Sequence, residues 1–322
     1  MTYTEALKSG VRLINQNWQI VLIQVIVVIL SSLGFFVIVG IPFAIAFIIF
    51  GIDLTKFTEI RDILEILRTP SEIITKYIGL LLIVVVSLFI YLIMITILSI
   101  YAFAGSLGII CRSVVDKELR FRVQIFFDEA KKNFSRLLGF TLVMGLIMVV
   151  MAFFLGILAG GIGALVSIAR SQDSILALFL ATFFSLILAL IVLTVVLIIL
   201  SVTLYGIAPL LFKSMGPIKS VKESVRYLIR HPYAFWFYAA LFGGYLFVSL
   251  TLILIKYPLT LLPIIGTILS FPLQLISYAF ETYLGLVIIA SILTFYYSTE
   301  IRKEDAIESV PDEEMAQEKE SS

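Results

Sequence analysis

The chain has little of what soluble enzymes use for chemistry. Its 322 residues include one cysteine, Cys111, and one histidine, His231. A single cysteine excludes both an intramolecular disulfide and a Cys-based metal cluster. We interpret Cys111, at the end of an apolar run, as an inert small hydrophobe. His231 has no neighbouring acid cluster and is interpreted as a polar residue at the membrane boundary. No cofactor and no metal are predicted.

Charge is also scarce. Only 14% of the residues are Asp, Glu, Lys or Arg, and the net charge is +1. The chain therefore lacks the basic field that nucleic-acid binding requires. In contrast, 61% of the residues are hydrophobic and the mean hydropathy is +1.12. A soluble domain cannot hide this much apolar surface, because folding always leaves a large exposed area. The composition predicts an integral membrane protein.

Long apolar runs supply about six segments that reach the roughly 20 residues that a bilayer requires. They are expected at about 18–50, 78–111, 137–168, 174–212, 233–256 and 272–298. The predicted fold class is therefore all-α, a polytopic transmembrane helical bundle.

Several runs contain helix breakers or glycines. The first run is expected to break at Gly40-Ile-Pro42, and the fourth to bend or end near Gly206 and Pro209. Residues 41–52 and 257–271 are left open as crossing, re-entrant or surface segments. Span three carries three glycines on nearly one side, for which we predict close helix packing. They are Gly156, Gly160 and Gly163.

Two further segments are polar. Residues 53–77 have mixed charge and helical period, and predict a helix on the membrane surface that ends at Pro70. Residues 299–322 carry nine acids and three bases with few apolar residues. They predict an acidic, disordered cytoplasmic tail.

Three short amphipathic segments share one pattern, a Lys four residues before an Arg at the start of a long apolar run. The pairs are Lys8/Arg12, Lys132/Arg136 and Lys222/Arg226. Two spans follow each pair. We therefore predict three parallel repeats of an interfacial helix plus two spans, within a single membrane domain of residues 1–298. The repeats are expected at about 2–111, 124–212 and 217–298.

The distribution of the basic residues predicts the orientation. Of the 23 Lys and Arg, 17 lie before span one, between spans two and three, between spans four and five, and after span six. The positive-inside bias then places both termini in the cytoplasm. A prokaryotic plasma membrane is the expected location.

The Lys/Arg pairs are the first candidate site. Like charges four residues apart on a helix cost about 0.2–0.5 kcal/mol in water. Near an anionic leaflet each base gains about 1 kcal/mol, so attraction is larger. Lys8, Arg12, Lys132, Arg136, Lys222 and Arg226 are therefore candidate lipid- or anion-binding residues, with anionic membrane lipids as partners. The alternative interpretation is that these charges only set the topology of interfacial helices.

Glu281 is the second candidate, because it is the one ionisable residue well inside a predicted span. A carboxylate in lipid costs several kcal/mol, so it should face protein or water, or be protonated. It can serve an ion- or proton-coupled site or contact a lipid headgroup. It can equally be a neutral hydrogen-bond donor to a neighbouring helix, or lie near the outer surface if span six starts later. Lys256 is a candidate partner.

The spans contain no HExxH motif, no paired carboxylates and no Ser/His/Asp set. We therefore expect a protein that is not an enzyme. The leading function is a lipid-interacting or scaffolding role at the cytoplasmic leaflet. The alternative is a transporter or permease for a small or lipidic substrate that uses Glu281.

Three local features carry a resemblance to a known group. They are the amphipathic helix from Ala6 to Trp18, the connector Leu211-Phe-Lys-Ser-Met-Gly-Pro-Ile-Lys-Ser-Val-Lys-Glu-Ser, and the closing Tyr296-Tyr-Ser-Thr-Glu-Ile-Arg302. With these features the chain resembles a loose group of prokaryotic six-span inner-membrane proteins. That group includes the membrane domain attached to some glycerophosphoryl diester phosphodiesterases. The chain has no phosphodiesterase domain, so the resemblance implies the membrane architecture and no catalytic activity.

Overall fold

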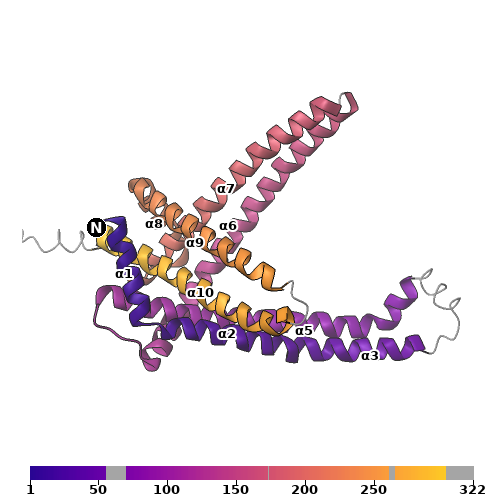
Figure 1. The fold of residues 1–322 in the computed structure, drawn as a ribbon, viewed down its shortest axis with the longest axis horizontal. Coiled ribbons are helices and arrows are strands. Elements are labelled where there is room, and N and C mark those ends of the chain that lie inside the picture. Colours follow the sequence, from indigo (N-terminus) through magenta and orange to yellow (C-terminus); the bar gives the residue numbers. More distant parts are fainter. Residues whose placement is uncertain (56–69, 173, 261–264, 302–322) are drawn as a thin grey trace, which may run out of the picture. The chain divides into compact units, whose positions relative to one another are not determined.

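The protein is described from a computed structural model, which covers residues 1–55, 70–172, 174–260 and 265–301. Every element within these ranges is helical (Figure 1). In chain order they are α1 (Tyr3–Gln16), α2 (Gln19–Phe35), η1 (Phe36–Gly40), α3 (Ile41–Thr55), α5 (Pro70–Val115), α6 (Val123–Gln172), α7 (Ser174–Phe212), α8 (Pro217–Arg230), α9 (Pro232–Thr260), α10 (Ile265–Tyr296) and η2 (Tyr297–Ile301).

Six helical segments are long and apolar enough to cross a membrane. They are Gln19–Phe50, Ile78–Val115, Val123–Ser171, Ser174–Phe212, Pro232–Pro258 and Pro272–Ile301. The prediction of an all-α, polytopic helical protein is confirmed.

The chain divides into two compact units. The smaller unit, residues 22–103, contains α2, η1, α3 and the first part of α5. Here Gly34 lets α2 approach α5, since a Cβ at this position would lie 3.2 Å from the methyl carbon of Met94. The ring of Phe35 packs edge-on against Tyr91, with centroids 5.4 Å apart. Most of the other side chains that the structure describes in this unit, at 22–50 and 78–103, are apolar and at least partly exposed, as expected of helix faces that contact lipid.

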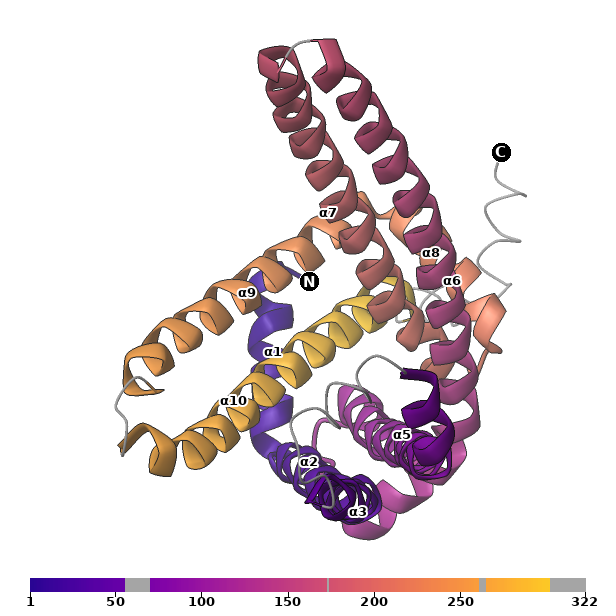
Figure 2. The ribbon, with the colours of Figure 1, turned by 90° about the vertical axis from the view of Figure 1, so that its right-hand side faces the viewer.

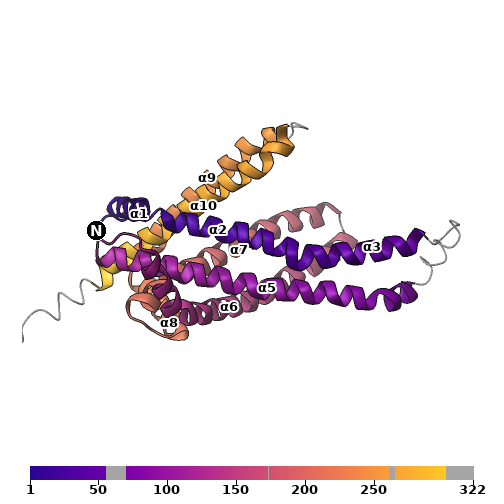
Figure 3. The ribbon, with the colours of Figure 1, turned by 90° about the horizontal axis from the view of Figure 1, so that it is seen from below.

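The larger unit, residues 1–21 and 104 onward, buries most of its core at one end of its long helices. Most buried residues of α6 lie between Phe126 and Met144, those of α7 between Ser201 and Leu210, and those of α10 between Leu286 and Tyr296. Outside these ranges Ala169, Ala177 and Ser277 are also buried. Beyond this packed end, α6 and α7 run side by side away from α8 (Figure 3), and most of their side chains are apolar and exposed.

The first amphipathic segment, α1, packs across α10 (Figure 2). Its buried residues are Ala6, Gly10, Leu13 and Ile14. Gly10 permits the close approach, because a Cβ there would lie only 2.8 Å from the backbone nitrogen of Ser291. The helix therefore attaches the start of the chain to the last span.

Helix breakers act less strongly than the sequence suggests. The break expected at Gly40-Ile-Pro42 is the π-helical turn η1 within a continuous helix, and residues 41–52 continue that helix in α3. Pro42 lacks an N–H, and its ring would clash with the carbonyl four residues earlier in a regular α-helix. A wider π turn directly before it relieves that clash.

Two other prolines lie close to helix boundaries. The fourth helix includes Gly206 and Pro209 and ends at Phe212, close to where the sequence predicted a bend or an end. Pro70 begins α5, in keeping with the preference of proline for the first turn. Of the surface helix predicted at 53–77, residues 56–69 lie outside the described residues. In the segment 257–271, α9 reaches Thr260 and α10 starts at Ile265, so only 261–264 lie outside them.

Two predicted boundaries differ in the structure. The second amphipathic segment is not a separate helix but the first turns of α6, which runs from Val123 to Gln172. The first and third segments end where the sequence supplies a stop, at Asn17 and at His231-Pro232. No such stop follows Arg136. At the other end of the chain, Thr299–Ile301 belong to η2 and not to the predicted tail, whose residues 302–322 lie outside the described residues.

The prediction of close packing at the glycines of span three is wrong within this chain. Gly156, Gly160 and Gly163 are exposed, and a Cβ added at any of them would meet nothing within 4 Å. Among the described glycines, those where a Cβ would lie under 3.0 Å from a neighbour are Gly10, Gly105, Gly108 and Gly206, all at the packed end of the larger unit.

Candidate functional site

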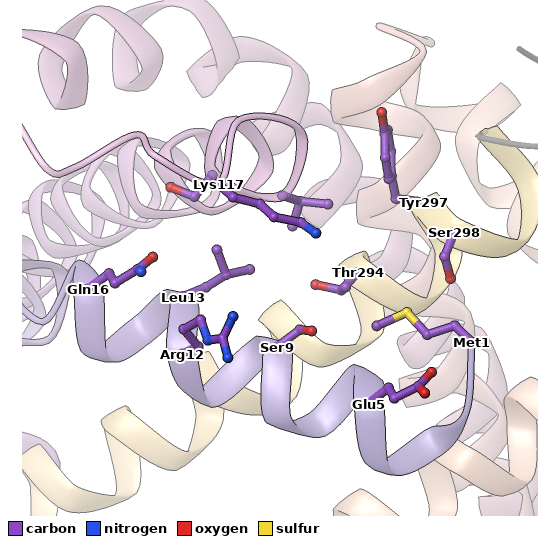
Figure 4. A pocket seen from close by; sticks show the side chains of 12 residues that line it. Met1, Glu5, Ser9, Arg12, Leu13, Gln16, Lys117, Thr294, Tyr297 and Ser298 are labelled. Carbon is purple, nitrogen blue, oxygen red and sulfur yellow. The ribbon is translucent and has the colours of Figure 1, made fainter.

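A pocket of about 570 Å³ lies where α1 faces the end of α5 and the junction of α10 with η2 (Figure 4). Arg12 from α1 and Lys117, just after α5, both point into it. Its remaining walls are mostly polar. They are formed by Met1, Glu5, Ser9, Leu13, Gln16, Ser113, Val114, Thr294, Tyr297 and Ser298.

A capping box closes the N-terminal end of α1. The Thr2 side chain accepts a hydrogen bond from the Glu5 backbone N–H, and the Glu5 carboxylate accepts one from the Thr2 backbone N–H at 2.9 Å. Such reciprocal bonds satisfy two of the free donors at a helix start. The bond from the Thr2 backbone lowers the pKa of Glu5 below its usual range. The Glu5 carboxylate therefore caps the start of α1, although it also lines the pocket.

Three of the pocket hydroxyls, those of Ser113, Thr294 and Ser298, are oriented by protein partners. The side chain of Asn17 donates to the hydroxyl of Ser113 at 3.3 Å, which leaves the Ser113 proton available as a donor. Thr294 and Ser298 instead donate to backbone carbonyls of their own helix, at 2.7 and 2.9 Å, and present lone pairs. Together with Arg12 and Lys117, the pocket combines two cations with oriented donors and acceptors. This arrangement suits a phosphate group that carries a polar substituent.

Of the six predicted bases, only Arg12 lines this pocket. Lys8 is exposed beside it, along a shallow hollow of α1 that also includes Asn15 and Gln16. Lys117 was missed by sequence reasoning, because it lies in a connector outside the Lys/Arg pattern. Its position four residues after Ser113, at the end of a span, is the signal that could have indicated it.

In the second amphipathic segment the strongest contact involves a residue that was not singled out. Glu129 is buried, forms an ion pair with Arg112 (Oε1 to Nε, 2.8 Å) and accepts a hydrogen bond from Asn133 at 2.9 Å. Gly108 makes room for it. Lys132 is exposed, whereas Arg136 is partly buried, and its Nη1 has no hydrogen-bond partner in the part of the chain that the structure describes.

In the third segment, α8, the predicted bases lie on the exposed side. Arg226 pairs with Glu223 at 3.2 Å, and Lys222 lies beside it. The buried side carries Ser220, whose hydroxyl donates to the carbonyl of Gly206 on α7. Small residues thus bring α8 against α7, in the way that Gly10 brings α1 against α10.

The three segments bury equivalent positions. The residue two positions before the Lys is buried in each, at Ala6, Ala130 and Ser220, and the Lys itself is exposed in each. Each segment also packs on the end of a preceding or final span. The predicted threefold repeat accounts for this common register and stays a prediction.

At the end of the third segment, His231 and Arg230 surround Glu300 of η2, with Nε2 of His231 at 3.5 Å and Nη1 of Arg230 at 3.9 Å. Nδ1 of His231 lies 2.8 Å from the hydroxyl of Tyr233. Tyr227 bonds Thr299 at 2.7 Å, and burial raises the pKa of its phenol. His231 therefore joins α8 to the end of the last span, and η2 contacts both this cluster and the pocket.

Glu281 is half-buried on α10 and does not line the pocket. Two residues further on, the hydroxyl of Tyr283 donates to the side-chain oxygen of Asn15 on α1 at 2.8 Å. Glu281 thus lies near the level where α1 ends, not far from the packed end of the helices. Lys256 is close to the far end of α9. No ion pair joins Glu281 and Lys256 among the described residues.

Metal-ligating residues do not gather in the described part of the chain, where no group of three or more His, Cys, Asp or Glu could hold an ion. Cys111 is buried in α5. No family model, no curated protein and no solved structure matches this chain. The resemblance to prokaryotic six-span inner-membrane proteins therefore stays a prediction.

Proposed function

We propose that this integral membrane protein binds an anionic phospholipid headgroup in the pocket between α1, the end of α5 and η2. The observation that carries the proposal is the convergence of Arg12 and Lys117, from two different elements, on one polar pocket. Six apolar helices make membrane lipids the ligand available at highest concentration. Each base near an anionic leaflet contributes about 1 kcal/mol to this attraction.

The orientation follows from the charge distribution. The pocket lies at the end of the helices where α1, the start of α6 and α8 are found, and these segments and their connectors hold most of the Lys and Arg. The positive-inside bias then places the pocket at the cytoplasmic leaflet. We assign the protein a role that requires no catalysis, as a lipid-interacting or scaffolding component of a prokaryotic plasma membrane.

The test is native mass spectrometry of the full chain, purified and exchanged into equal mixtures of phosphatidylglycerol and phosphatidylcholine. The double variant Arg12→Gln with Lys117→Gln should retain at least tenfold less phosphatidylglycerol than the parent. The matched control is Lys8→Gln with Lys132→Gln, which removes the same charge at exposed positions outside the pocket. It should retain the lipid within twofold of the parent.

Equal losses in the two variants would show that the whole basic surface attracts the lipid and that the pocket does not bind it. If inorganic phosphate at millimolar concentration displaces the lipid completely, the site recognises the phosphate alone and the role of a lipid is wrong.

A further inference from the structure

A second hollow, chemically unlike the first, lies where α6, α7 and α8 meet. It measures about 250 Å³, and every residue that lines it is apolar. Met144 and Met151 come from α6, Ile198 and Val202 from α7, and Val221 and Val225 from α8. Two membrane-spanning helices and one amphipathic helix therefore share one groove.

Water does not fill such a groove stably, because a buried water needs two to four polar partners and this lining offers none. An empty groove also loses the dispersion contacts of its walls. Apolar cavities of about 150 Å³ already bind a molecule of the size of benzene. The hydrocarbon available to a groove between membrane spans is an acyl chain.

The exposed side of α8 indicates where the head of that lipid lies. Ile218 and Ile229 are 74% and 76% exposed, and Val225, which also lines the groove, is 40% exposed. Lys222 and Arg226 follow Val221 and Val225 directly in the sequence and lie next to this apolar stripe on the helix. An amphipathic helix with adjacent apolar and basic stripes takes up the boundary between acyl chains and headgroups.

We propose that the groove between α6, α7 and α8 binds one acyl chain of an anionic phospholipid whose phosphate lies against Lys222. Arg226 is already paired with Glu223, so Lys222 supplies the available charge. The apolar walls then hold the chain, and the base selects an anionic head. This inference rests on the proposed function only in taking membrane lipid as the ligand. The two sites share no residue.

The experiment uses the full chain in nanodiscs that contain phosphatidylglycerol with a diazirine on one acyl chain. After illumination, peptide mass spectrometry maps the labelled residues. The label should be at least fivefold stronger on 144–151 of α6 and on 195–202 of α7 than on residues 153–158 of α6, which lie outside the groove. Val225→Trp fills the groove and should reduce this label at least fivefold. Ile229→Trp places the same side chain on the same helix outside the groove, and should leave the label unchanged.

A second variant distinguishes recognition of the lipid headgroup from binding of the acyl chain. Lys222→Gln should reduce the preference of the groove label for phosphatidylglycerol over phosphatidylcholine at least threefold, while Arg12→Gln with Lys117→Gln leaves it unchanged. Even labelling along α6 and α7, or equal labelling in Val225→Trp and Ile229→Trp, would overturn the site. So would cross-links from the groove to a second copy of the chain in place of lipid. If the pocket at Arg12 and Lys117 proved not to bind lipid, the labelling of the groove would still stand as evidence for the acyl-chain site.

Discussion

Arg112 and Glu129 form an ion pair, with Nε and Oε1 2.8 Å apart, that joins the end of α5 to the start of α6. The Glu129 side chain is 6% exposed, and the Arg112 side chain is 51% exposed. Asn133 donates to the second carboxylate oxygen, so Glu129 has a partner for each oxygen. This pair connects the second span to the second amphipathic segment, where the sequence shows only a charged connector.

Arg112→Met should destabilise the protein by about 1–3 kcal/mol, because it leaves a buried carboxylate without its cation. Solvent screening of the half-exposed arginine favours the lower part of this range. The measurement is thermal unfolding with a thiol-reactive dye, since the one cysteine, Cys111, is buried and reacts when the fold opens. Arg120→Met removes an exposed base of the nearby connector and serves as the control. Equal unfolding temperatures for the two variants would show that the ion pair adds no stability.

Gly10→Val should destabilise the packing of α1 on α10 by about 1–3 kcal/mol, the range for an overpacked contact. The added atoms would meet the backbone of Ser291, which cannot move as a flexible side chain can. Gly156→Val makes the same change at a glycine with open space around it. Unfolding of both variants, followed by the same dye assay, should show a loss only for Gly10→Val. A comparable loss for Gly156→Val would restore the close packing that the sequence predicted in span three.

The class of fold was readable from the sequence because it depends on composition and run length. Six apolar runs of sufficient length predict six helices, and the structure contains them. The positions of Lys8 and Arg12 on the outer side of α1 also followed from the 3.6-residue period alone. Both inferences use properties that are local to one segment.

The contacts between segments could not be predicted in the same way. Glu129 looks like any helix-surface acid in the sequence, and its burial depends on Gly108, which lies 21 positions earlier. Lys117 joins Arg12 only because α1 and the end of α5 meet at one pocket. The break predicted at Pro42 failed for a different reason. A long apolar helix can absorb Pro42 in one π turn, so the residue type predicts a local distortion and not an end.

The stability of the α1 cap should depend on pH through Glu5. Hydrogen bonding from Thr2 holds the pKa of this carboxyl below its usual range in the folded protein. The contribution of Glu5 to the free energy of unfolding is therefore fully present above the pKa of an unfolded glutamate, about 4.3. It is lost as the pH falls through the lowered pKa that Glu5 has in the folded protein. The unfolding temperatures of the parent and of Glu5→Gln should differ at pH 7 and converge once the pH has fallen below the lowered pKa of Glu5 in the folded protein. A constant difference across this range would mean that the charge of Glu5 does not contribute to the cap.

Glu281→Gln distinguishes the lipid-binding role from the predicted alternative of a transporter. A headgroup site at Arg12 and Lys117 makes no use of Glu281, which does not line the pocket. The variant should therefore retain phosphatidylglycerol within twofold of the parent in native mass spectrometry. A proton- or ion-coupled carrier instead requires a titrating carboxylate, and the neutral amide removes it while keeping its size. Proteoliposomes with a trapped pH-sensitive dye measure that activity directly. We expect the same proton flux for parent and variant. A fivefold or larger loss of flux in Glu281→Gln would favour the carrier and contradict the scaffolding role.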